Sequence, residues 1–227
     1  MNASVMKKYM FLGDSITDAH HNLGVDEKGL GDGYVSIIDR YLNEKDKKDG
    51  KGEKVKVLNR GHDGFTLRGV LHFLNRDCIL KNPDVVTILI GCNDVGILMN
   101  TGKSLEERNF AEDYDRLLCE IEEYTKASMI CMAPFIFPHP LEYENWIPHI
   151  RKIEKIEREV ASRHHAVFIP LHDRLQKEAE ALGYEAVTTD GIHLTAQGAK
   201  VVADEWIKIY RKCIECKLSV DKTIEIL

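Results

Sequence analysis

Five short runs of β-forming residues recur along this chain, and segments with helical periodicity lie between them. Several of the runs are apolar without polar alternation, which is typical of strands that are buried on both faces. The runs cover residues 9–12, 55–58, 85–90, 129–132 and 166–169. This repeated order of strand and then helix predicts a parallel sheet whose two faces are both covered by helices.

The helical segments each place apolar side chains at three- and four-residue spacings, so each would present one apolar stripe to the sheet. They cover residues 34–42, 110–124 and 147–160, and a last one runs to Cys213 with Thr195 as its N-cap. The polar, glycine-bearing segment 44–54 indicates a solvated loop. No repeat or flexible linker divides the chain, so residues 1–227 are predicted to form a single domain.

The composition argues against several classes of partner. With 31 Lys and Arg against 37 Asp and Glu, the chain has a formal net charge of −6 and no general attraction for nucleic-acid phosphates. Its longest uncharged stretch, 127–141, contains three prolines and is shorter than the roughly 20 apolar residues that span a bilayer. We therefore expect neither a nucleic-acid nor a membrane partner, and we leave a homo-oligomer open.

The N-terminus and the cysteines indicate the compartment. The apolar stretch 9–12 stops at Gly13 and Asp14, which is too short for a signal-peptide core. The six cysteines have irregular spacings in a chain that is large enough to fold without disulfides, so we expect reduced thiols in the cytoplasm. Only Cys213 and Cys216 make a C-x-x-C pair, and without further ligands at matching spacing we expect no metal or redox role for them.

Polar residues follow the predicted strands, at the carboxyl ends where parallel sheets place their binding sites. The first strand is followed by Gly-Asp-Ser at 13–15, the second by Asn-Arg-Gly-His-Asp-Gly at 59–64 and the third by Gly-Cys-Asn-Asp at 91–94. Asp190 and His193 precede the last helix. A hydroxyl, a carboxylate with an imidazole, and hydrogen-bond donors for an oxyanion are the components of a serine hydrolase.

The order and placement of these blocks resemble the SGNH branch of the GDSL esterase and lipase superfamily. Its four blocks are matched here by Ser15, Gly61, Asn93 and His193, and the resemblance covers residues 11–206. The resemblance implies an α/β fold of three layers, α/β/α and flavodoxin-like. It also implies a five-stranded parallel sheet in the order 2-1-3-4-5.

The same resemblance implies a role for each matched residue. Ser15 would be the nucleophile, His193 its general base and then acid, and Asp190 the carboxylate that orients His193. The oxyanion hole would consist of the N–H groups of Ser15 and Gly61 and the side-chain amide of Asn93.

The residue types themselves suit these roles. Imidazole has a pKa near neutrality, so His193 can take the proton of a serine hydroxyl and make the oxygen nucleophilic. Asp190 lies three residues earlier, so one turn can bring its carboxylate to the ring nitrogen that faces away from Ser15. Gly61 has no Cβ and would let a reacting carbonyl approach its N–H, and Asn93 offers a neutral donor that pH does not change.

Other polar residues of these blocks are interpreted as structural. Asp14, Asp18 and Asp94 are expected to bond locally at turns or helix starts. Arg60 and Arg68 are expected to be surface residues or members of structural ion pairs.

The neighbouring histidines do not form spaced ligand sets. At 20–21, 164–165 and 62–63, adjacent side chains diverge on a strand or a helix, so we expect no metal and no other cofactor. His62 and Asp63 depart from the small and polar residues that are usual between the two glycines of this family block.

The motif contexts indicate the substrate. GDSITD, NRGHDGFT, ILIGCNDVG and DGIHLT look most similar to bacterial intracellular carbohydrate acetylesterases of this superfamily. This implies a small-molecule partner, an ester with a short acyl group such as acetyl on a carbohydrate. Segment 133–148 combines aromatic residues with four prolines and predicts a stiff loop beside the site. Within it, Trp146 either stacks on a sugar ring or is the first buried residue of the next helix.

Two alternatives remain open at this point. A lysophospholipase or thioesterase that acts on longer acyl chains would use the same catalytic residues. A flavodoxin-like protein would instead bind phosphate or flavin where the loop of Ser15 and Thr17 meets a helix N-terminus.

Overall fold

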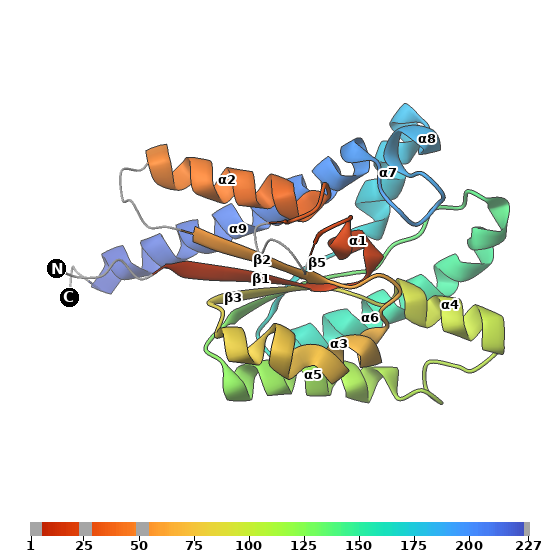
Figure 1. The fold of residues 1–227 in the computed structure, drawn as a ribbon, viewed down its shortest axis with the longest axis horizontal. Coiled ribbons are helices and arrows are strands. Elements are labelled where there is room, and N and C mark those ends of the chain that lie inside the picture. The colour runs from red at the N-terminus through yellow and green to blue at the C-terminus, as the bar shows by residue number, and fades with distance from the viewer. Residues whose placement is uncertain (1–5, 23–28, 49–54, 225–227) are drawn as a thin grey trace.

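The computed structural model describes residues 6–22, 29–48 and 55–224, with the backbone alone at 45–48 and 214–224. A five-stranded sheet lies between two layers of helices (Figure 1). All neighbouring strands are parallel, in the order β2-β1-β3-β4-β5, so the predicted fold and strand order are confirmed. The strands are β1 Lys7–Gly13, β2 Val55–Gly61, β3 Val85–Leu89, β4 Ser128–Met132 and β5 Val167–Ile169.

Strand β1 shows why these strands are apolar without alternation. Tyr9 and Phe11 pack into the core on one face of the sheet, and Met10 and Leu12 pack into the core on the other. All four side chains are at most 1% exposed. Burying each such side chain contributes about 1.5–3 kcal/mol to the stability of the fold. Because these side chains alternate between the two faces, β1 stabilises both helical layers.

The helices divide between these two faces (Figure 1). The first layer contains α2 Tyr34–Lys48, α7 His172–Leu182 and α9 Ala196–Ile224. The second contains α3 Leu67–Asp77, α5 Phe110–Tyr124 and α6 Ile147–Arg163. Shorter elements complete the described chain: α1 Ser15–Asp18, η1 Ile79–Lys81, α4 Cys92–Thr101, η2 Leu141–Trp146 and α8 Tyr184–Val187.

The four helices predicted from periodicity correspond to α2, α5, α6 and α9. Thr195 caps α9 as predicted, because its hydroxyl accepts a hydrogen bond from the N–H of Gly198 (3.3 Å). The prediction of a loop at 44–54 is wrong at its start, since α2 continues to Lys48. Glu and Lys are strong helix formers and extend the helix despite their charge. Residues 49–54 lie outside the described part of the chain.

A membrane span requires a helix that is both long and apolar. None of the described helices meets both requirements.

Candidate active site

Ser15 begins a one-turn helix at the carboxyl end of β1 (Figure 1). The preceding residue, Asp14, is the N-cap, and its carboxylate accepts a hydrogen bond from the N–H of Ile16 (3.0 Å). This confirms the prediction that Asp14 holds the turn through local hydrogen bonds. The N–H of Ser15 has no hydrogen-bond partner among the described residues and can therefore donate to a ligand.

Asp190 and His193 lie in a loop between α8 and α9 that is closed by its own hydrogen bonds. The Asp190 carboxylate accepts from the N–H groups of Ile192 (2.9 Å) and His193 (2.8 Å). The Thr188 hydroxyl donates to the main-chain oxygen of His193 (2.7 Å). The backbone around the imidazole is thus fixed before any substrate binds.

The structure brings Ser15, His193 and Asp190 into one hydrogen-bonded chain. His193 Nε2 lies 2.9 Å from Ser15 Oγ, and His193 Nδ1 lies 2.6 Å from Asp190 Oδ2. An ionised carboxylate can only accept, so Nδ1 carries the proton and Nε2 is free to accept from the serine hydroxyl. The side chains of His193 and Asp190 are 46% and 50% exposed, so a ligand can reach them.

The pKa of Asp190 supports this protonation state. Partial burial raises the pKa, but hydrogen bonds from the His193 side chain and from two backbone N–H groups outweigh burial and lower it. Asp190 is therefore ionised near neutral pH and can orient the imidazole.

Gly61 does not have the surroundings expected of an oxyanion donor. Its N–H donates to the side-chain oxygen of Asn59 (2.9 Å). A Cβ at Gly61 would lie 2.2 Å from the backbone nitrogen of Asp18, so the missing side chain makes room for α1 rather than for a substrate. Gly61 serves the packing of β2 against α1.

Gly64 is a candidate donor that the sequence reasoning missed. The N–H of Phe65 donates to the oxygen of His62 (3.1 Å), and in the turn 62–65 that this bond closes, Gly64 has a φ of +71°. Glycine adopts such a φ without strain. The N–H of Gly64 has no partner in the described part of the chain, and a Cβ there would meet nothing within 4 Å. The second glycine of the 59–64 block was the available signal in the sequence.

Asn93 lies in the first turn of α4, at the carboxyl end of β3. Its side-chain nitrogen donates one hydrogen bond to the main-chain oxygen of Phe65 (2.9 Å). A primary amide has two N–H groups, so one remains for another acceptor. The contact with Phe65 also ties the loop after β3 to the turn 62–65.

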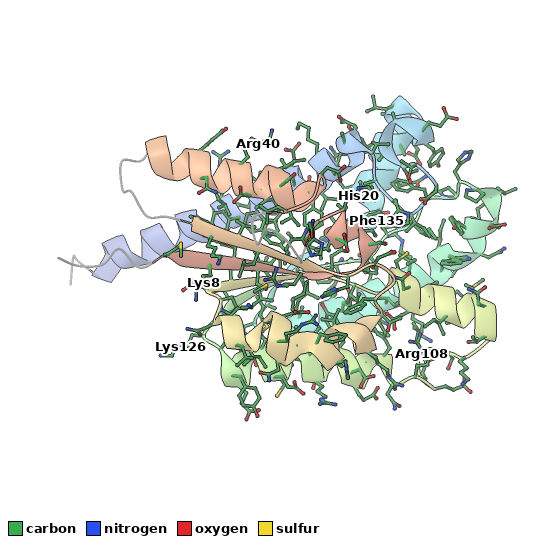
Figure 2. The ribbon with its side chains drawn as sticks, viewed as in Figure 1. Lys8, His20, Arg40, Arg108, Lys126 and Phe135 are labelled. Carbon is green, nitrogen blue, oxygen red and sulfur yellow. The ribbon has the colours of Figure 1, made fainter. Side chains whose placement is uncertain are left out.

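Asp94 is structural, as predicted, but its hydrogen bonds reach residues distant in the chain rather than local ones. Its carboxylate accepts hydrogen bonds from the N–H of Leu67 (2.9 Å) and from the guanidinium of Arg108 (3.0 Å). Arg108, labelled beside α4 in Figure 2, also donates to the main-chain oxygen of Asp94 (3.0 Å). Asp94 thereby joins α4 to the start of α3.

The two arginines are structural in different ways. Arg68 pairs with Asp113 (2.8 Å), as predicted for an ion-pair residue. The prediction is wrong for Arg60, which is buried, has no ion pair among the described residues and donates to the main-chain oxygen of Asn59 (2.7 Å).

A cavity of about 650 Å³ opens beside Ser15 and His193. Its walls come from α1, the start of α2 and the segment that leads into α9. Gly61, Gly64 and Asn93 are not among the described residues that line it. His20, labelled in Figure 2, marks this end of the sheet, and Lys8 and Lys126 mark the opposite end. The polar residues of the wall, apart from Ser15 and His193, include Asp18, His20, Asp32, Asp63, Thr189 and Thr195.

The proline-rich segment 133–148 lies beside the site, as predicted, but only its first part is a loop, because η2 begins at Leu141 and α6 at Ile147. The N–H of Phe137 donates to the oxygen of Gly191 (2.9 Å), within the loop that carries Asp190 and His193. The Phe137 side chain is buried in the core. Trp146 is half-buried, packs against the Tyr143 ring (4.9 Å between centroids) and immediately precedes α6. Of the two interpretations of Trp146, the structure favours the start of a helix.

Three buried carboxyl groups lie behind these loops. Burial is the main cause that raises the pKa of Asp14 to about 7 and that of Asp94 to about 6. Glu157 of α6 is fully buried, neither carboxylate oxygen has a partner among the described residues, and burial raises its pKa well above the usual value. Neighbouring carboxylates add repulsion that raises the pKa of Asp14 and of Glu157 further.

The histidines and cysteines form no metal cluster in the described part of the chain. His62 bonds to Asp77 (2.8 Å), and His164 bonds to Glu122 (2.8 Å) and Asp115 (3.2 Å). The described cysteines are all free thiols. Of the predicted C-x-x-C pair, the Cys216 side chain lies outside the described residues.

Two curated proteins are similar to this chain over most of its length. An acetylxylan esterase of Geobacillus stearothermophilus is 25% identical over 211 residues, which are 89% of this chain and 93% of that protein. The isoamyl acetate-hydrolyzing esterase of Saccharomyces cerevisiae is 24% identical over 226 residues, 89% of this chain and 85% of the yeast protein.

Solved structures share the fold. An α/β hydrolase enzyme from the metagenome of Lake Arreo superposes with a TM-score of 0.78 at 24% identity, covering 89% of this chain and 94% of the other. A variant of the Geobacillus acetylxylan esterase superposes with a TM-score of 0.77 at 22% identity, covering 91% and 96%. The model of the GDSL-like lipase/acylhydrolase family matches residues 11–201. The chain therefore belongs to the GDSL-like lipase/acylhydrolase family and is an esterase.

Proposed function

We propose that this protein hydrolyses acetyl esters of carbohydrates through an acyl-enzyme on Ser15. The observation that carries the proposal is the hydrogen-bonded chain from Ser15 through His193 to Asp190. Catalytic mutants of the related Geobacillus esterase replace a serine, an aspartate and a histidine, the same three residue types. No cofactor takes part in the proposed reaction.

The reaction follows from the proton positions. Ser15 Oγ attacks the ester carbonyl carbon, and its proton passes to Nε2 of His193. The tetrahedral intermediate collapses, the bond to the alcohol oxygen breaks, and His193 returns the proton to that oxygen. Water then repeats the sequence on the acyl-enzyme and releases the carboxylic acid. Asp190 stabilises the imidazolium in both halves by accepting from Nδ1.

The negative charge of the intermediate falls on the former carbonyl oxygen, which needs donors. We assign the N–H of Ser15, the N–H of Gly64 and the free amide N–H of Asn93 to this task. Gly64 replaces Gly61 because the Gly61 N–H is already bonded to Asn59. Gly64 lies between Asp63, which lines the cavity, and Phe65, which accepts a hydrogen bond from Asn93. Gly64 is therefore adjacent in the chain to the cavity wall and to the residue that holds Asn93.

The two relatives support an acetyl group as the acyl part. Their names specify acetylxylan and isoamyl acetate, which share the acetyl group and differ in the alcohol. The cavity supports a polyhydroxylated alcohol, since carboxylate, imidazole and hydroxyl groups of its wall can bond to sugar hydroxyls.

The alternative of a flavin- or phosphate-binding protein has less support. Its phosphate would lie at the N-terminus of α1, where the buried Asp14 carboxylate already accepts from Ile16. A second anion there would meet repulsion whenever Asp14 is ionised. The lysophospholipase or thioesterase alternative uses the same catalytic residues. It is distinguished from the acetylesterase by its preference for longer acyl chains.

Acetate release from acetylated xylo-oligosaccharides, with p-nitrophenyl acetate as a general ester, tests the proposal. Wild type should hydrolyse both, and Ser15→Ala should hydrolyse neither above background. Asp190→Asn should be severely impaired, because an amide can hold the wrong imidazole tautomer. A Ser15→Ala variant that keeps wild-type turnover would refute the proposal. We also propose a cytoplasmic location, on the strength of the free thiols.

A further inference from the structure

His62 is fixed on several sides, although the catalytic chain does not contain it. Its N–H donates to the oxygen of Gly13 (3.0 Å), just before the Ser15 turn, and its oxygen accepts from Phe65 to close the turn 62–65. Its imidazole Nε2 bonds to the carboxylate of Asp77 (2.8 Å) at the end of α3. The ring is 15% exposed.

Asp77 is in turn held by the neighbouring guanidinium. Arg76 donates to both carboxylate oxygens of Asp77, each at 2.7 Å. Partial burial raises the pKa of Asp77, but the hydrogen bonds from His62 and Arg76 outweigh it and lower the pKa to about 2. Asp77 is therefore an ionised anchor at any pH at which an esterase would work.

An aromatic stack connects the same residues from the other side. The His62 ring stacks on Phe65 with 4.3 Å between centroids and 27° between planes. Phe65 stacks on Phe73 of α3 at 5.5 Å, and the Arg76 guanidinium covers Phe73 at 4.2 Å. Phe65 is the residue whose oxygen accepts from Asn93. The position of His62 thus determines where Phe65 lies, and Phe65 fixes the Asn93 amide.

We propose that His62, anchored by Asp77, is a positioning residue for the oxyanion hole. It sets the turn 62–65 so that the N–H of Gly64 and, through Phe65, the amide of Asn93 face the charge that develops on the substrate. This inference rests on the proposed function, because it needs a tetrahedral intermediate on Ser15. His62 contacts no reacting atom and acts only through the donors.

The test uses His62→Ala, Asp77→Ala and the double variant in the full chain. Misplaced donors weaken binding of the transition state more than binding of the ester, so each single variant should lower kcat about ten- to hundredfold. KM should change by less than about threefold. The kcat of the double variant should be at most about threefold below that of the more impaired single variant, because the two substitutions break the same contact between His62 and Asp77. His164→Ala is the matched control, because His164 is 12% exposed, also bonds to carboxylates and lies away from the site.

A second readout reports on the first nucleophilic attack by Ser15, without any later hydrolysis of an acyl-enzyme. A p-nitrophenyl phosphonate diester reacts once with Ser15: the serine oxygen bonds to phosphorus, p-nitrophenolate leaves, and the hydroxyl proton passes to His193. The phosphoryl oxygen then occupies the oxyanion hole. The rate of nitrophenolate release should fall in parallel with kcat in the His62 and Asp77 variants and stay unchanged in His164→Ala.

The possible results distinguish a failure of this inference from a failure of the proposed function. An active wild type together with His62→Ala and Asp77→Ala variants that keep kcat within about twofold would overturn the positioning role and leave the esterase intact. Losses confined to KM, or equal losses in His164→Ala, would overturn it as well. A Ser15→Ala variant with wild-type turnover would instead overturn the proposed function.

Discussion

The imidazole of His193 lies 2.9 Å from the hydroxyl of Ser15, although 178 positions separate the two residues in the chain. Ser15 directly follows the turn after β1, and His193 lies in the loop before the last helix. Every parallel strand delivers its carboxyl end to the same edge, so the fold brings chain-distant loops together there. The contact depends on the whole sheet being formed.

The first prediction concerns this pair. Ser15→Ala and His193→Ala should each lower kcat for p-nitrophenyl acetate by about a thousandfold or more, and the double variant should be little worse, because the two residues act as one proton-transfer unit. Steady-state kinetics on the purified variants, with circular dichroism to verify the fold, measures this. Losses that multiply in the double variant would mean that the two residues act independently.

The second prediction concerns Asn93. Asn93→Ala should lower kcat by about 10²- to 10³-fold and change KM little, because its free N–H would bind charge that appears only in the transition state. The comparison of kcat with KM on p-nitrophenyl acetate measures this. An effect on KM alone would place Asn93 in substrate binding.

The third prediction separates the two glycines. Gly61→Ala should destabilise the fold by more than about 2 kcal/mol, because its methyl group would lie 2.2 Å from the Asp18 backbone nitrogen. The methyl group of Gly64→Ala would enter open space, so this variant should lose only about 1 kcal/mol of folding stability, because alanine is strained at the positive φ of this position. Urea unfolding of both variants tests the difference. A Gly61→Ala variant as stable as wild type would contradict the packing role.

The sheet and the catalytic chain were predictable for different reasons. Strands that are buried on both faces favour apolar runs, and β-forming runs of this kind, most of them continuous and one interrupted by Lys56, place all five strands. The catalytic roles of Ser15, Asp190 and His193 were predicted from positions next to predicted strands or the last helix and from the family resemblance. No local sequence pattern alone indicates that these three residues form one site.

The oxyanion loop was less predictable, because the relevant facts are three-dimensional. Gly61 and Gly64 are both glycines of one block, and only the structure shows which N–H is already bonded and which Cβ would meet a backbone atom. Helix α3 was not predicted, because its apolar stripe is short and directly follows the polar block. Glu157 gives no sequence signal at all, since its burial depends on packing between layers.

The fourth prediction concerns the pH dependence of stability at Asp14. Burial raises the pKa of Asp14 from 3.8 to about 7, so between these values the folded protein holds a proton that the unfolded chain has lost. Wild-type stability attributable to Asp14 should therefore fall as pH rises from about 4 to about 7 and stay level above. In Asp14→Asn, the amide oxygen would still accept from the N–H of Ile16, but the side chain has no charge to bury.

The stability of Asp14→Asn relative to wild type should consequently increase over this pH range, by an amount on the order of 1–4 kcal/mol. Urea unfolding of both proteins from pH 4 to pH 8 measures it. Asp94 and Glu157 titrate in both proteins, so their own contributions largely cancel in the difference. A difference that is flat with pH would show that Asp14 is ionised in the folded state throughout.

The last prediction concerns the length of the acyl chain. The segment 133–148 buries Phe135 and Phe137 in the core, so these rings do not line an apolar channel for a fatty acyl group. The wall of the cavity beside Ser15 also carries several polar side chains. In an open apolar channel, each additional buried CH₂ would contribute about 0.8 kcal/mol, or about fourfold in kcat/KM. In a closed acyl site, extra methylenes meet packed side chains and are penalised by about 1–3 kcal/mol. We therefore expect kcat/KM for p-nitrophenyl esters to be highest for acetyl or propionyl and to fall towards octanoyl. A monotonic rise through octanoyl would favour the lysophospholipase or thioesterase alternative, while Ser15→Ala would still abolish turnover.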